Sequence, residues 1–188
     1  MRLFIAVPIE KRTQKLLEAQ IELAQTDLNH DLKWVSGDNL HLTLKFLGDT
    51  NQNKLSDIKE SMKNTCSPFL KFNIYYDHFG AFPSTDYPKV LYFGLKNGKN
   101  TLIKLQNKLE NDLFNKGFQK EDRDYTPHLT FARTRKKTNM RQLKYDYQDF
   151  IKENNLRILQ KVNKVALIES QLYKSGPVYE ELYTVNLK

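Results

Sequence analysis

Hydrophobic and polar residues alternate along two short stretches of nearly identical sequence. Residues 41–44 read His-Leu-Thr-Leu, and residues 128–131 read His-Leu-Thr-Phe. Residues two apart share a face of a β-strand. We therefore expect two strands, the first burying Leu42, Leu44 and Phe46, and the second burying the matching apolar positions. In both strands the His and the Thr would lie together on the opposite face.

Other stretches follow helical or strand periodicity. Apolar residues recur at helical spacing in three stretches, at residues 17–28, 55–62 and 102–113. Further strands are expected at residues 3–7, 69–82, 90–95, 164–170 and 179–187, with a short extended piece at 33–35. The remaining segments are predicted to be a loop at 83–89, a mixed helical or irregular region reaching about residue 159, and a connection containing Ser175, Gly176 and Pro177.

The order of these elements indicates an internal duplication. A strand, a helix and a motif strand occur in succession in each half, starting at residues 3–7 and again at 90–95. Such a repeat predicts two lobes related by a pseudo-two-fold axis, which would set the two motif strands across a cleft. We predict an α+β fold with antiparallel sheets and flanking helices. A single domain spans residues 1–188, with one motif in each lobe.

Composition narrows the class of protein. The chain of 188 residues is 39% hydrophobic and 28% charged, which is typical of a soluble globular domain. No apolar run approaches the roughly 20 residues of a membrane helix, and the short apolar start reads as a strand rather than a signal peptide. Because Cys66 is the only cysteine, no internal disulfide or cysteine-based metal site can form. We expect a cytoplasmic monomer.

Charge favours a polyanionic partner without proving one. The net charge of +8 and the pI of about 9.4 suit RNA, although many basic proteins bind no nucleic acid. A basic segment spans residues 133–144. Its first member, Arg133, is expected at a strand end, where it reaches the cleft rim and pairs with a phosphate or, alternatively, forms a surface salt bridge.

The paired motifs are the candidate chemistry. One His-x-Thr is a weak signal, but two copies at equivalent places in a duplicated chain are a strong one. His41 and His128 would supply an acid and a base near neutral pH. Thr43 and Thr130 would hydrogen-bond an anion between them. We expect no metal and no cofactor, because two histidines without companion Asp, Glu or Cys motifs make a poor metal site.

Other residues receive structural assignments. His30 is expected to be solvated or to cap a helix, and His78 to have a structural or surface role. Three aromatic residues that would be able to stack on a base are instead assigned to core or rim packing, namely Phe46, Phe82 and Tyr125.

The motifs, with the sequences around them, resemble the two-histidine (2H) phosphoesterase superfamily. The similarity covers nearly the whole chain and is greatest to bacterial and archaeal RNA 2′,3′-cyclic phosphodiesterases, once called 2′-5′ RNA ligases. It includes residues 2–6, 34–35, 39–48, 79–83, 127–133, 169–170 and 176–179.

The resemblance implies a bilobed, metal-independent enzyme that opens RNA 2′,3′-cyclic phosphate ends to 2′-phosphates. It implies that His41 is the proton donor and His128 the acceptor, whereas symmetry leaves these roles open. The implied partners are RNA ends, including tRNA fragments or small cyclic nucleotides, and 2′-5′ ligation is the reverse activity. Two alternatives remain: a non-catalytic RNA-end binding module, and a metal-binding protein that uses the two histidines.

Overall fold

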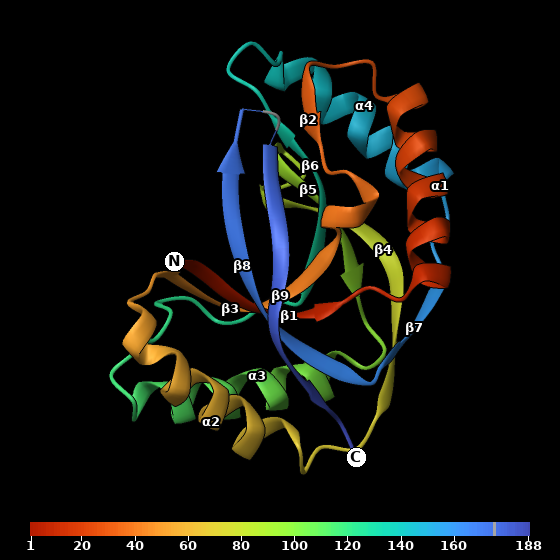
Figure 1. Cartoon of the computed structure of the whole chain (residues 1–188). Coiled ribbons are helices and arrows are strands. Elements are labelled where there is room, and N and C mark those ends of the chain that lie inside the picture. The colour runs from red at the N-terminus through yellow and green to blue at the C-terminus, as the bar shows by residue number, and fades with distance from the viewer. Residues whose placement is uncertain (175) are drawn as a thin grey trace.

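The computed structural model describes residues 1–174 and 176–188, and it contains two antiparallel sheets (Figure 1). The first sheet has the strand order β3-β1-β8-β9. Its strands are β1 (Arg2–Pro8), β3 (His41–Asp49), β8 (Lys164–Tyr173) and β9 (Gly176–Asn186). The second sheet has the order β2-β6-β5-β4-β7. Its strands are β2 (Leu32–Trp34), β4 (Phe72–Ser84), β5 (Tyr87–Leu95), β6 (His128–Thr134) and β7 (Ile158–Val162).

Four α-helices cover the sheets in two pairs (Figure 1). Helices α2 (Leu55–Cys66) and α3 (Lys99–Phe114) pack on each other and on the first sheet, while α1 (Lys11–Asp27) and α4 (Met140–Glu153) pack on each other and on the second. Each helix buries one apolar stripe, as Leu102, Leu105, Leu109 and Leu113 do in α3. None of the helices in residues 1–174 and 176–188 is long and apolar enough to cross a membrane.

The two halves of the chain repeat one topology. In the first half, β1 pairs with the motif strand β3, and the intervening helix α1 covers the other sheet. In the second half, β5 pairs with the motif strand β6, and the intervening helix α3 again covers the other sheet. The predicted α+β class, with antiparallel sheets in two related lobes, is therefore confirmed.

The predicted face of Phe46 is wrong, because a β-bulge interrupts the alternation in β3. Ala6 pairs with Thr43 and Ile5 with Lys45, so Leu44 is an extra residue on this strand. A bulge of this kind moves every later side chain to the other face. The buried face therefore receives Lys45, whose exposed fraction is 4%, while Phe46 is 60% exposed.

Several boundaries also differ from the prediction. The loop expected at residues 83–89 is a tight hairpin, because β4 and β5 continue through most of it. The region expected to be mixed helical or irregular contains the helix α4 and, at its end, the edge strand β7, which was not expected. Gly176 and Pro177, expected in a connection, already belong to β9, and Ser175 lies outside the described residues.

Candidate active site

The two motif histidines are held in the same way, one in each sheet. His41 opens β3 and His128 opens β6. The Nδ1 atom of His41 lies 2.8 Å from the carbonyl oxygen of Asn39, and that of His128 lies 2.7 Å from the carbonyl oxygen of Thr126. Because a carbonyl only accepts, Nδ1 must carry a proton in both rings. The Nε2 atom of each imidazole is left to give or to take a proton.

Aromatic rings fix the orientation of each imidazole. Ring-centroid distances are 4.7 Å from His41 to Phe4, 5.1 Å from His41 to Tyr179, 4.8 Å from His128 to Phe82, and 5.4 Å from His128 to Tyr92. Phe4 belongs to a small buried cluster with Ala6, Ala166 and Ile168, separate from the main core. Both faces of β1 are thus buried. Because β1 pairs with β3 up to His41, it holds this residue rigidly in place.

A cavity of about 570 Å³ joins elements of the two lobes beside His128. Thr43 and Phe46 from β3 line it, together with Phe82 from β4 and Tyr125 from the segment before β6. The Tyr125 hydroxyl donates to the carbonyl oxygen of Thr43 at 2.9 Å. Thr43 and Thr130 are both half-buried, at the same parity as the histidine of their own strand.

Burial lowers the pKa of His41 and that of His128 below the ordinary value for histidine. The hydrogen bond to the backbone carbonyl partly opposes this effect in each ring, since it favours the charged form. The charge of Arg133 lowers both pKa values further, and the charge of His128 also lowers the pKa of His41. The three groups are therefore near enough to interact electrostatically, although His128 lines the 570 Å³ cavity and His41 a neighbouring one of about 210 Å³.

Arg133 is exposed on the motif face of β6 because this strand has a bulge of its own. Leu91 pairs with Ala132 and Tyr92 with Thr130, which leaves Phe131 as the extra residue. Arg133 lines a second cavity of about 420 Å³, together with Trp34 and Tyr179. Among residues 1–174 and 176–188, no carboxylate forms an ion pair with Arg133.

The other two histidines lie away from these cavities. His30 is not solvated as expected: its side chain is 9% exposed, and its Nε2 atom lies 2.7 Å from Oδ2 of Asp146 in α4. His78 is on β4, with Nδ1 at 2.8 Å from the carboxylate of Asp77. Both contacts are structural in kind.

Two features of the site were not predicted from the sequence. The carbonyls of Asn39 and Thr126 fix the tautomer of each histidine. They belong to the backbone, so the residue types at these positions do not indicate this role. Lys45 was missed because strict alternation gave it the wrong face.

The described part of the chain contains no cluster of three or more His, Cys, Asp or Glu side chains arranged to hold a metal ion.

Comparison with known proteins gives concordant matches over the whole chain. A family model described as LigT like Phosphoesterase matches residues 7–92 and 94–179, and each range contains one motif. A protein of Methanothermobacter thermautotrophicus named RNA 2′,3′-cyclic phosphodiesterase is 31% identical over 189 residues, which are 100% of this chain and 99% of the relative. A protein of the same name from Methanocaldococcus jannaschii is 32% identical over 180 residues, or 96% and 97% of the two chains.

Solved structures share the fold. A protein of Thermus thermophilus superposes with a TM-score of 0.77 at 23% identity, covering 99% of this chain and 97% of that one. LigT of E. coli, solved in complex with 3′-AMP, superposes with a TM-score of 0.76 at 22% identity and the same coverage.

Proposed function

Because the chain belongs to the LigT-like phosphoesterase family, we propose that it opens RNA 2′,3′-cyclic phosphate ends to 2′-phosphates with two histidines as acid and base. The family match confirms the resemblance that the two motifs suggested. The name shared by full-length relatives supports a phosphodiesterase acting on RNA ends.

The proposed reaction is an in-line displacement at phosphorus. His128, neutral at Nε2, takes a proton from water as the water oxygen attacks phosphorus. His41, protonated at Nε2, gives its proton to the 3′ oxygen as the bond from phosphorus to that oxygen breaks. The product carries a 2′-phosphate and a free 3′ hydroxyl. The rings end with their protonation states exchanged, and exchange with solvent restores them.

Binding of the anionic substrate favours uptake of the needed proton from solvent. In the free protein burial holds the pKa of both histidines below its ordinary value, which favours the neutral form of each ring. A negative phosphate between the rings favours the charged form of an imidazole and raises its pKa. Substrate binding thereby favours the state in which one ring is protonated.

Three side chains are proposed to hold the phosphate. The hydroxyls of Thr43 and Thr130 donate to its non-bridging oxygens, where negative charge grows in the transition state. Arg133 has no ion-pair partner among the described residues, and its guanidinium is suited to pair with one of these oxygens.

The observation that carries the proposal is the matched anchoring of the two imidazoles through Nδ1. A module that only holds RNA ends has no need for two rings with fixed tautomers and free Nε2 atoms. The test is incubation with an oligonucleotide that ends in a 2′,3′-cyclic phosphate, followed by identification of the product. A 2′-phosphate is expected. Binding without turnover would favour the RNA-end module instead.

Ligation uses the same groups with another nucleophile. If a 5′ hydroxyl replaces water, His128 takes its proton, the bond from phosphorus to the 3′ oxygen breaks, His41 gives a proton to that oxygen, and a 2′-5′ linkage forms. We propose this ligation as a secondary activity, to be measured with a second oligonucleotide that carries a 5′ hydroxyl.

A further inference from the structure

The segments that lead into the two motif strands are held in different ways. Before the first motif, β2 lies along the outer edge of β6 and forms a backbone ladder from Leu32 to Trp34. Before the second motif, residues 119–126 lead to β6, while β3 remains an edge strand of its sheet. In the part of the chain that the structure describes, no backbone hydrogen bond joins residues 119–126 to β3.

The side chain of Lys45 joins residues 119–126 to β3 in place of backbone hydrogen bonds. Its Nζ atom donates to Oε1 of Glu110 in α3 at 2.8 Å and to the carbonyl oxygen of Gln119 at 2.7 Å. It also lies 3.7 Å from the carboxylate of Glu121. One buried lysine on β3 thus contacts both α3 and the segment before the second motif.

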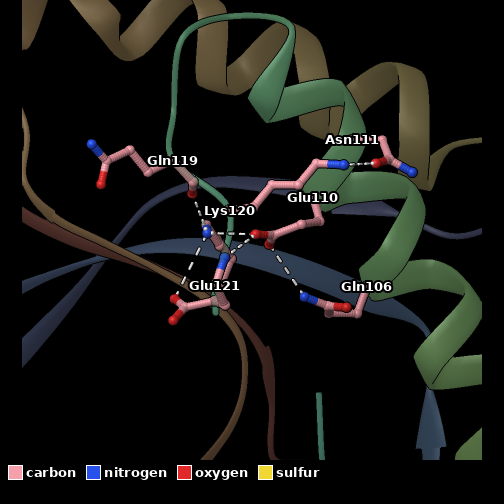
Figure 2. Close-up of polar contacts among 7 residues, drawn as sticks. Gln106, Glu110, Asn111, Gln119, Lys120 and Glu121 are labelled. Atoms are coloured by element: carbon pink, nitrogen blue, oxygen red, sulfur yellow. Dashed lines mark hydrogen bonds and ion pairs between the residues drawn. The ribbon is translucent and has the colours of Figure 1, made fainter. Parts of the chain in front are cut away.

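Glu110 is the second centre of this network (Figure 2). Its Oε1 atom accepts from the backbone N–H of Glu121 at 2.7 Å, and its Oε2 atom accepts from the amide of Gln106 at 3.2 Å. The side chains of Lys45 and Glu110 are only 4% and 11% exposed. Buried charges hold a fixed geometry when every partner is in place, because leaving one of them unpaired is costly.

The network continues to the proposed acid–base site through the same segment. Beyond Glu121 the chain forms one wall of the 570 Å³ cavity. Tyr125 then donates to the carbonyl oxygen of Thr43, and Thr126 accepts the Nδ1 hydrogen bond of His128. Residues 119–126 therefore lie between the two motifs and contact both of them.

We propose that Lys45 is a positioning residue, which clamps residues 119–126 against β3 and so sets the cavity wall and the hydrogen bond from His128 to Thr126. This inference rests on the proposed function for its kinetic consequence. The β-bulge at Leu44 is what turns Lys45 toward α3, so the bulge and the clamp form one device. Ala132 occupies the equivalent position in β6, where β2 already covers the edge.

The test compares three variants that separate positioning from stability. Lys45→Met leaves the Glu110 carboxylate buried without its cation, so this variant is expected to lose stability as well as the clamp. Lys45→Met with Glu110→Gln removes the unpaired charge and is expected to recover much of the stability. It does not recover the bridge to Gln119. Lys45→Arg keeps the charge and is expected to rescue both properties in part.

Kinetics with a 2′,3′-cyclic-phosphate oligonucleotide give the first readout. The double variant is expected to lose roughly 10- to 100-fold in kcat/KM, mostly through KM, because small displacements of a site have effects of this size. Lys116→Met is the matched control. It breaks the exposed ion pair with Glu60 at 2.8 Å, just beyond the end of α3, the helix that carries Glu110. This control is expected to leave KM unchanged.

Native-state proteolysis gives a second readout that needs no activity. Arg123 is exposed within the clamped segment, and trypsin is expected to cleave after it several-fold faster in the double variant than in the wild type. A double variant with wild-type KM and wild-type cleavage overturns the proposal, as does a change confined to the melting temperature. A wild-type protein without hydrolase activity would instead refute the proposed function, and the cleavage assay would still test the clamp.

Discussion

Phe46 and Arg133 occupy equivalent positions in the two halves of the chain. Each lies five residues beyond its motif histidine and is the first exposed residue after a β-bulge. The duplication thus places an aromatic ring on one motif strand and a cation on the other. Phe46 lines the larger cavity and Arg133 the smaller one. This difference suits a substrate that has a base on one side and a phosphate on the other.

The first prediction concerns Arg133. Its charge lowers the pKa of both motif histidines, so Arg133→Gln is expected to raise both values and move the pH–rate profile to higher pH. Loss of a charge-assisted phosphate contact is expected to cost about 10- to 100-fold in kcat/KM. Arg133→Lys should keep the wild-type profile. The profile is measured as kcat/KM against pH for all three proteins. A Gln variant with the wild-type pH profile would contradict an electrostatic effect of Arg133 on the histidines.

The second prediction concerns Phe46. Stacking of a base on an aromatic ring is worth about 1–3 kcal/mol, so Phe46→Ala is expected to raise KM for an RNA end about tenfold. The pH–rate profile should not move, because Phe46 carries no charge. Phe114→Ala serves as a control, since this ring is 54% exposed and lines neither cavity. Equal KM values for the Phe46 and Phe114 variants would argue against a stacking role.

The two motif strands were predictable because they depend on local periodicity. Leu42 and Leu129 are buried as alternation requires, and both motif histidines begin a strand. The bulges were not predictable, because one extra residue in a ladder depends on the pairing partner and leaves no mark on the strand itself. For this reason alternation assigned Lys45 and Phe46 to the wrong faces.

Long-range pairing also explains the errors elsewhere in the chain. His30 follows the end of α1 among polar residues, which locally indicates a solvated side chain. Only the packing of α1 against α4 brings Asp146 to it. The strand β7 was missed for a similar reason, because its five residues form a strand through pairing with β4.

The third prediction concerns this buried contact. His30→Ala removes a hydrogen-bonded partner of Asp146, and we expect a loss of about 1–2 kcal/mol in the free energy of unfolding. Activity per folded molecule should stay unchanged, because His30 lines neither the 570 Å³ cavity nor the 420 Å³ cavity. Denaturant unfolding and steady-state kinetics measure the two effects. A large fall in kcat would show that His30 takes part in the chemistry.

The fourth prediction concerns the basic segment. Lys136 and Lys137 are exposed beyond β6, and Arg135 is engaged with Asp31 at 3.4 Å. Replacing all three by Ala is expected to raise KM for an oligonucleotide but not for a cyclic mononucleotide. The dependence on salt should also become shallower, by a log–log slope of roughly 0.7 for each lost phosphate contact. An unchanged slope would assign the segment to a solvated surface.

The fifth prediction concerns metal. Hydrolysis is expected to proceed at its full rate in EDTA and to yield a 2′-phosphate, because the proposed acid and base are both imidazoles. Loss of activity on chelation, with recovery on adding a divalent ion, would refute the metal-free mechanism. A 3′-phosphate product would show that the other ester bond breaks.

The most direct test of the two-histidine mechanism is the pH–rate profile of the wild type, together with single and double histidine variants. The wild-type profile of kcat/KM is expected to be bell-shaped, since one ring must be protonated while the other is neutral. Its centre should lie below about pH 6.5, the ordinary histidine pKa, because burial lowers the pKa of both rings.

His41→Ala and His128→Ala should each lower kcat by about 10²- to 10⁴-fold, with less effect on KM. The double variant should lose much less than the product of the two losses, because groups that act as a unit are not additive. Full activity after removal of either motif histidine would contradict the mechanism.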